Sequence, residues 1–174
     1  MFIFFQKVFE LESKLILLIE LFSNIGLQTI FKFITRLGDG YLYFFVIILL
    51  TLSRSNNSFK FLIFFIFAFL IERIVYYTLK NSIKRMRPFE KLKLNKLYIK
   101  PPDKYSFPSG HSSAAFLFAT LVSYFFPELK LSLFIFASLV GISRVILKLH
   151  FPTDILFGAF LGVLIANISI MLIF

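Results

Sequence analysis

The sequence predicts an all-α integral membrane protein, an antiparallel bundle of about five transmembrane helices with an N-terminal amphipathic interfacial helix. Hydrophobic residues make up 59% of the 174 positions, and the mean hydropathy is +0.87, whereas soluble domains are about 45–50% apolar. Several apolar runs approach the roughly 20 residues that a spanning helix needs. Strands are not expected, because only helices or closed barrels span lipid and the alternating barrel pattern is absent.

Five apolar segments account for the predicted spans. The first is the shortest, although it is uncharged after Asp39. Short connections at 54–58 and 127–130 force antiparallel neighbours. The predicted spans are 38–53, 59–79, 110–126, 130–149 and 153–174.

The N-terminal 36 residues carry a polar stripe on an otherwise apolar helix, which is typical of an amphipathic helix. The stripe consists of Gln6, Glu10, Ser13, Glu20, Asn24, Gln28 and Lys32. A sixth span with an inward polar face would also fit this pattern. We favour an interfacial helix with a break near Gly26, so the chain is interpreted as one domain (1–174) with an amphipathic segment (1–36) and a transmembrane bundle (37–174) that carries the chemistry.

The charge balance indicates an anionic partner at the membrane. The net charge is +10, from 19 Lys and Arg against 9 Asp and Glu, which suits anionic headgroups or an anionic substrate. We expect no nucleic-acid partner. The sequence has no cysteine, which excludes disulfides, Cys-ligated metal sites and a thiol nucleophile.

The polar residues gather on one face of the predicted bundle. Five spans place the 37–40 turn, the 80–109 loop and the 143–152 turn on the same side. The loop is strongly basic, with Lys80, Lys84, Arg85, Arg87, Lys91, Lys93, Lys96, Lys100 and Lys104 against Glu90 and Asp103.

The first polar cluster on this face runs from Lys80 to Pro88. Lys80 and Arg87 are seven residues apart, close to two helical turns, so on a continuing helix they would point the same way. By itself this spacing also fits a solvated basic helix end.

The second cluster is Pro-Ser-Gly-His at 108–111, which opens a predicted helix. Ser109 is a suitable N-cap, and Gly110 allows a ligand to approach the backbone closely. The free N–H groups of a helix N-terminus bind anions, and His111 would lie beside such an anion. A capped helix with an interfacial histidine is the alternative.

The third cluster spans 143–154. Arg144 offers a bidentate fork for phosphate oxygens. Asp154 follows His150 by four residues, within reach if the first helical turn is formed, and a carboxylate on one ring nitrogen makes the other a better base or nucleophile. A structural Asp–His pair would also fit.

Together the three clusters favour phosphoryl transfer, which depends mainly on positioning and on neutralising phosphoryl oxygens. Ionisable groups at membrane depth are costly and usually functional. We expect no metal and no other cofactor, since no acidic cluster is present to hold magnesium or calcium.

The three motifs, K-x6-R-P at 80–88, P-S-G-H at 108–111 and S-R-x5-H-x3-D at 143–154, resemble the signature of the type 2 phosphatidic acid phosphatase superfamily. The resemblance implies that His150 attacks phosphorus, that Asp154 orients it, and that His111 protonates the leaving oxygen. It also implies a set of phosphate-binding residues, namely Lys80, Arg87, Ser109, Gly110 and Arg144.

The resemblance implies an integral membrane lipid phosphatase that acts on a lipid phosphate in the bilayer. The reaction would proceed through a phosphohistidine intermediate. Its leading substrates would be lipid A 1-phosphate or undecaprenyl diphosphate, with phosphatidylglycerophosphate as a further candidate. It implies a bacterial inner membrane location with the site facing the periplasm, although the basic loop by itself favours the cytoplasm. The alternatives are a non-enzymatic anion or lipid transporter, and a vanadate-binding haloperoxidase-like protein, which the apolar spans disfavour.

Overall fold

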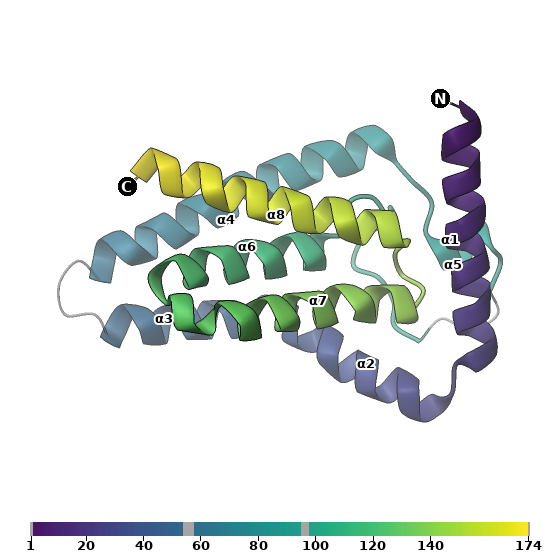
Figure 1. The fold of residues 1–174 in the computed structure, drawn as a ribbon, viewed down its shortest axis with the longest axis horizontal. Coiled ribbons are helices and arrows are strands. Elements are labelled where there is room, and N and C mark those ends of the chain that lie inside the picture. The colour runs from purple at the N-terminus through teal and green to yellow at the C-terminus, as the bar shows by residue number, and fades with distance from the viewer. Residues whose placement is uncertain (1, 54–57, 95–97, 174) are drawn as a thin grey trace.

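A computed structural model describes residues 2–53, 58–94 and 98–173, and within these ranges the chain is helical with no strand. The helices occupy most of the predicted positions (Figure 1). They are α1 (Phe2–Phe22), α2 (Ile25–Leu37), α3 (Tyr41–Ser53), α4 (Ser58–Ile83), α5 (Pro88–Lys91), α6 (Gly110–Phe125), α7 (Lys130–Ile146) and α8 (Pro152–Ile173), with a 3-10 turn at Pro127–Leu129.

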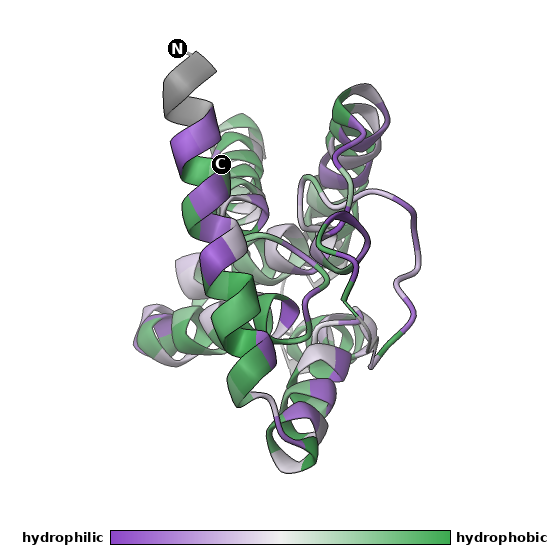
Figure 2. Ribbon diagram, turned by 90° about the vertical axis from the view of Figure 1, so that its right-hand side faces the viewer, coloured by the Kyte–Doolittle hydropathy of each residue, from purple (hydrophilic) through white to green (hydrophobic). Residues whose placement is uncertain are grey.

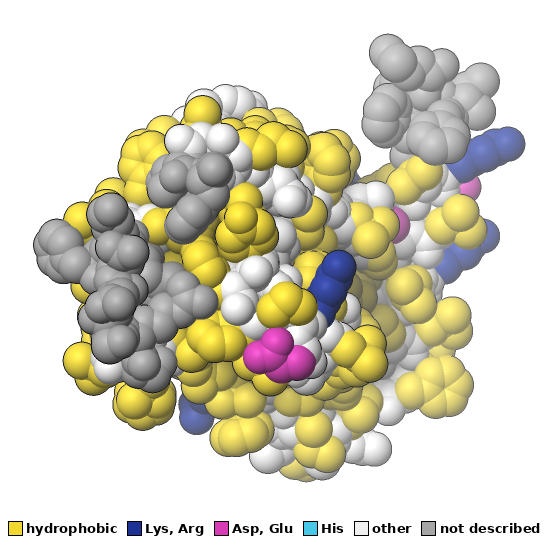
Figure 3. Space-filling model, turned by 60° about the vertical axis from the view of Figure 1, so that its left-hand side comes forward, with side chains coloured by type: hydrophobic (Ala, Val, Ile, Leu, Met, Phe, Trp, Pro, Cys, Tyr) yellow, Lys and Arg dark blue, Asp and Glu magenta, His cyan; other side chains and the backbone are white. Residues whose placement is uncertain are grey.

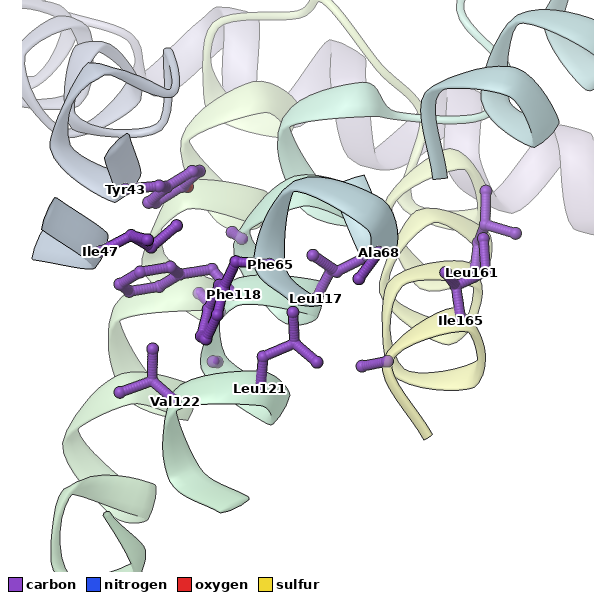
Figure 4. Packing of buried hydrophobic residues seen from close by; sticks show 14 of the residues in the cluster. Tyr43, Ile47, Phe65, Ala68, Leu117, Phe118, Leu121, Val122, Leu161 and Ile165 are labelled. Atoms are coloured by element: carbon purple, nitrogen blue, oxygen red, sulfur yellow. The ribbon is translucent and has the colours of Figure 1, made fainter. Parts of the chain in front are cut away.

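The bundle consists of α3, α4, α6, α7 and α8, which run side by side in Figure 1. Its core is apolar and centres on α6, which packs against α8, α7 and α4. In Figure 4 Leu117, Phe118 and Leu121 of α6 lie between Tyr43 of α3 and Leu161 of α8. The predicted all-α membrane bundle is therefore confirmed.

Three stretches of the described residues are long and apolar enough to cross a membrane: Leu62–Lys91, Pro127–Ile146 and Pro152–Leu172. The α1–α2 pair would add a fourth if both helices formed one bent span. The other two bundle helices are shorter, with 13 residues in α3 and 16 in α6. These two helices accompany the longer spans for only part of their length.

The N-terminal segment is broken near the predicted position, because α1 ends at Phe22 and Asn24 caps α2. The Asn24 side chain accepts a hydrogen bond from the Leu27 N–H at 2.7 Å. The two helices meet at a bend of 120°, so that α1 crosses one end of the bundle (Figure 1). Figure 2 views this end and shows hydrophilic and hydrophobic residues alternating along α1.

The same end of the bundle carries the 84–109 loop and the α7–α8 turn, as the sequence predicts (Figure 1). The predicted span ends at 79, close to the end of α4 at Ile83, and Lys84 has a φ of 51°. Lys80 and Arg87 therefore do not lie on one continuing helix, the condition under which they would have pointed the same way. Arg87 instead has an extended backbone and precedes α5.

The opposite end of the bundle carries the α6–α7 turn and the C-terminal end of α8 (Figure 1). Figure 3 brings this end forward and shows a surface dominated by hydrophobic side chains with few charges. Exposed residues such as Leu52, Phe160 and Met171 contribute to the apolar exterior of the bundle, as lipid contact requires. Most of the predicted 54–58 hairpin lies outside the described residues.

Two glycines of α8 allow it to lie directly against α6. A Cβ atom at Gly162 would come within 2.2 Å of the Ser113 carbonyl oxygen, and one at Gly158 within 2.5 Å of the Ser109 carbonyl oxygen. The contact therefore brings the N-terminal ends of α6 and α8 close together, and both ends carry predicted site residues.

Candidate active site

A cavity of about 680 Å³ opens at the polar end of the bundle. Charged and polar residues from all three sequence clusters line one part of it, namely Arg87, Gly110, His111, Arg144 and His150. Apolar side chains of α3 and α4 line another part, namely Phe44, Ile47, Leu62, Phe65, Ile66, Phe69 and Leu70. One continuous space therefore joins a cationic region to an apolar wall.

His150 lies in the turn between α7 and α8 and is 2% exposed. Its Nε2 atom is 3.3 Å from Nη1 of Arg87, and its Nδ1 atom is 3.8 Å from Oδ2 of Asp154. Burial lowers the pKa of His150 well below its usual value, and the positive charges of Arg144, Arg87 and Lys80 act in the same direction. Burial and these charges thus favour the neutral imidazole, and Nε2 lies on the side of Arg87.

Asp154 is fully buried in the first turn of α8. Its Oδ2 atom accepts a hydrogen bond from the Phe151 N–H at 2.8 Å, and its Oδ1 atom accepts one from Arg85 at 2.6 Å. The sequence predicts a direct pair with His150, but the 3.8 Å separation is too long for a hydrogen bond. Within the described structure Nδ1 of His150 has no hydrogen-bond partner, so Asp154 faces the ring across a small gap.

Lys80 and Arg87 converge on a carboxylate that the sequence clusters do not include. Both donate to Oδ1 of Asp103, Lys80 at 2.9 Å and Arg87 at 2.6 Å, and Tyr76 donates to Oδ2 at 2.9 Å. Burial opposes ionisation of Asp103, but the hydrogen bond and charge of Lys80 and the charge of Arg87 outweigh it and lower its pKa to about 2. The two cations are therefore gathered around one anionic group.

Arg144 projects from the last turn of α7 into the cavity and is 3% exposed. Its Nη1 atom donates to the Thr35 hydroxyl of α2 at 2.7 Å. Its Nε atom has no partner among the described residues. A buried guanidinium with an unused donor is costly, which makes this cation well suited to a ligand anion.

Ser109 and Gly110 begin α6 as the sequence predicts. The Ser109 hydroxyl accepts a hydrogen bond from the Ser112 N–H at 3.3 Å, the geometry of an N-cap. A Cβ atom at Gly110 would lie 2.9 Å from the Tyr76 ring, so only glycine fits there without displacing Tyr76. Gly110 therefore lets the Tyr76 ring pack against the first turn of α6, and Gly110 also lines the cavity.

His111 lines the same cavity from the first turn of α6. Its Nε2 atom lies 2.8 Å from Oδ1 of Asp39, in the turn before α3. The hydrogen bond to His111 lowers the pKa of Asp39 although partial burial opposes this shift. Burial lowers the pKa of His111, and the hydrogen bond to Asp39 opposes this shift. The carboxylate therefore works against burial and favours the protonated imidazole that a general acid needs.

The structure thus brings together all eight predicted site residues at one end of the bundle. It also adds four residues that the sequence patterns did not identify as site residues: Thr35, Asp39, Arg85 and Asp103. Each is a single polar residue in a turn, loop or helix, and its sequence spacing does not distinguish it from other polar residues.

The described residues contain no group of three or more His, Asp or Glu side chains arranged to hold a metal ion. Cations and helix N–H groups provide the positive field of the site. The arrangement is suited to holding a tetrahedral anion between two histidines.

The chain is similar to known membrane proteins. The family model of the PAP2 superfamily matches residues 61–174. The chain is 30% identical over 162 residues to the bacitracin transport permease protein BcrC of Bacillus licheniformis, covering 83% of this chain and 79% of the relative. It is 28% identical over 161 residues to an undecaprenyl-diphosphatase of Sulfolobus acidocaldarius, covering 88% and 77%.

The fold is also similar to a solved structure. A transmembrane PAP2-type phosphatidylglycerolphosphate phosphatase from Bacillus subtilis superimposes with a TM-score of 0.80 at 25% sequence identity. The superposition covers 95% of this chain and 86% of the other. The likeness thus extends beyond the matched family region to the N-terminal helices.

Proposed function

The chain belongs to the PAP2 superfamily, and on that premise we propose that it is a membrane lipid phosphatase acting through a phosphohistidine. Its relatives include an undecaprenyl-diphosphatase and a transmembrane phosphatidylglycerolphosphate phosphatase, and its own helices make it a multi-pass membrane protein.

The observation that carries the proposal is the shared cavity of His111, Arg144 and His150. Two imidazoles and a buried guanidinium surround one space, and Gly110 also lines it. The cavity continues to apolar side chains of α3 and α4. An amphiphilic phosphate ester, with its phosphoryl group among the cations and its tail beside α3 and α4, matches this distribution.

In the proposed mechanism Nε2 of His150 attacks phosphorus while the bond to the leaving oxygen breaks. His111 donates a proton to that oxygen, and Lys80, Arg87 and Arg144 neutralise the phosphoryl oxygens. Ser109 and the Gly110 N–H contribute further hydrogen bonds, and Asp154 orients His150. Water then attacks the phosphohistidine, His111 accepts its proton, and inorganic phosphate leaves.

Envelope lipids are the proposed substrate class, with lipid A 1-phosphate and undecaprenyl diphosphate leading and phosphatidylglycerophosphate as a further candidate. Relatives named as an undecaprenyl-diphosphatase and a phosphatidylglycerolphosphate phosphatase support this class. We place the protein in the bacterial inner membrane with the site facing the periplasm. The reaction is proposed to need no metal, because side-chain cations already surround the anion site.

Phosphate release from purified lipids in mixed micelles tests the proposal. Wild-type protein should hydrolyse at least one lipid among undecaprenyl diphosphate, lipid A 1-phosphate and phosphatidylglycerophosphate, with EDTA present. The matched variant Lys100→Ala, which changes an exposed residue of the basic loop, should retain activity. Absence of release from every lipid would contradict the proposal and leave the transporter alternative.

A further inference from the structure

The N-terminal helix contacts the surroundings of the candidate site through a buried carboxylate, Glu12. Glu12 of α1 is 6% exposed and accepts three hydrogen bonds. Its Oε1 atom accepts from the Thr153 N–H at 2.8 Å and from the Thr153 hydroxyl at 2.7 Å, and its Oε2 atom accepts from Arg85 at 2.7 Å. The carboxylate thus joins α1 both to the start of α8 and to the basic loop.

Arg85 continues this connection to Asp154. Its Nη2 atom holds Glu12, while its Nη1 atom donates to Asp154 at 2.6 Å and to Thr153 at 2.8 Å. The guanidinium also lies over the Phe151 ring, 4.2 Å from the centroid, and Phe9 of α1 contacts the same ring at 5.7 Å. Arg85 is therefore fixed between two carboxylates and one aromatic face.

The charges in this connection determine what Arg85 does to Asp154. One guanidinium shared by two carboxylates neutralises neither of them fully. Glu12 therefore offsets part of the Arg85 charge, so that Asp154 keeps negative potential on the side facing His150. Without the Glu12 charge, Arg85 would act on Asp154 alone and draw its carboxylate away from the ring.

Other contacts from α1 and α2 reach the same turn. Glu20 pairs with Lys148, which is fully buried two residues before His150. The Gln28 side chain lies 3.5 Å from the Ile146 carbonyl oxygen, and Thr35 holds Arg144. The N-terminal segment thus contacts the 144–153 region at several separate points.

We propose that Glu12 is a positioning residue for the nucleophile, acting through Arg85 and Asp154 on His150, so that the N-terminal segment is part of the catalytic machinery. This inference rests on the proposed phosphohistidine function. It assigns a role in turnover to α1, which the sequence suggests only as an interfacial helix.

The test compares Glu12→Gln with Glu10→Gln in the full-length protein. Glutamine keeps the size of the side chain and an oxygen for Thr153 but places an uncharged amide against Arg85. Glu10 is exposed on the same helix, so Glu10→Gln removes an equal charge at a matched position. Turnover of a lipid phosphate, binding of orthovanadate and thermal unfolding are measured for each variant.

Glu12→Gln should lower kcat on the order of 10- to 100-fold with little change in KM, as expected when a reacting group is misplaced. Orthovanadate, whose apical site would be Nε2 of His150, should bind more weakly. Glu10→Gln should match the wild type within about twofold. Glu12→Asp, which restores the charge, should recover part of the lost kcat.

The inference is overturned if Glu12→Gln matches Glu10→Gln in both kcat and orthovanadate affinity. It is also overturned if the loss of kcat is no larger than the loss of folded protein, because Glu12 would then be only structural. If the wild type releases phosphate from no lipid, the proposed function fails separately. The orthovanadate affinities of the same variants then decide the inference alone.

Discussion

Asp103 and Arg87 are joined twice: Nη2 of Arg87 donates to Oδ1 of Asp103 at 2.6 Å, and Nε donates to the Asp103 carbonyl oxygen at 3.2 Å. Lys80 donates to the same Oδ1 atom. A carboxylate of the basic loop therefore holds two of the cations proposed to bind the phosphoryl group. A bound substrate must share these donors with Asp103.

Replacing Asp103 by Asn should strengthen anion binding, because it removes a charge that competes for Lys80 and Arg87. We expect the Kd for orthovanadate to fall on the order of fivefold, about 1 kcal/mol, measured by titration of the purified protein. Glu90→Gln, which neutralises an exposed carboxylate of the same loop, is the control. Weaker binding in Asp103→Asn would show that Asp103 mainly orients the cations.

His150→Ala should abolish phosphate release, with a loss of at least about a thousandfold, because the variant lacks the proposed nucleophile. Wild-type protein incubated with lipid that carries a radiolabelled phosphoryl group, then quenched with alkali or detergent, should contain a base-stable, acid-labile phosphohistidine, and the variant should not. A His150→Ala protein with full activity would refute the mechanism.

Arg144→Ala should lower kcat/KM roughly 100- to 1,000-fold, since it removes a buried donor from the developing phosphoryl charge. Thr35→Val leaves Arg144 in place but removes its hydrogen bond, so we expect a smaller loss of about tenfold. Steady-state kinetics on the same lipid gives both values. Equal losses in the two variants would mean that Thr35 contributes more than an anchor for the guanidinium.

On the acid side, kcat/KM should fall only below pH 6.5, the usual pKa of a histidine, because the fall reports protonation of His150. Burial and the nearby cations disfavour the protonated ring of His150, so the neutral nucleophile persists as the pH falls. Burial also lowers the pKa of His111, with the hydrogen bond to Asp39 opposing the shift, so activity should decline as the pH rises through that lowered value and His111 loses the proton it donates. The measured values belong to the coupled pair. An acid limb above pH 6.5 would contradict the assignment of His150.

Asp39→Asn should lower kcat about tenfold on a lipid phosphate, because the carboxylate supports the protonated state of His111. The same variant should hydrolyse p-nitrophenyl phosphate at close to the wild-type rate, because that leaving group needs no proton. Comparing the two substrates separates a role in proton donation from a general structural defect. Equal losses on both would exclude the proton-donation role.

The sequence predicts the bundle and the gathering of the three clusters because both follow from local patterns. Apolar runs of spanning length determine the helices, and counting them determines which loops share a side. Ser109 is recognisable as an N-cap from its neighbours alone. The sequence also locates the break between α1 and α2 closely, although Asn24 rather than Gly26 marks it.

Other features depend on tertiary contacts that no spacing reveals. Glu12 lies off the polar stripe, yet it is buried against Arg85 and Thr153 from distant parts of the chain. The sequence places the end of the second predicted span at 79, close to the end of α4 at Ile83, but it does not show the path of the chain that follows. Arg87 lies beyond the end of α4. Its hydrogen bonds to the Leu149 carbonyl oxygen and to the Asp103 carboxylate, rather than a helix, hold it at the site.

A single backbone hydrogen bond joins the starts of two helices: the Ser109 N–H donates to the Asp154 carbonyl oxygen at 3.0 Å. Gly158 and Gly162 leave no space between α6 and α8, so the turn proposed to bind the anion and the carboxylate proposed to orient His150 are held against each other. The apolar side of the cavity is formed by other elements, namely α3 and α4, and the basic loop follows α4. Substitutions in α3, α4 or the loop can therefore alter the contacts made with a lipid tail or headgroup without moving the proposed reacting groups.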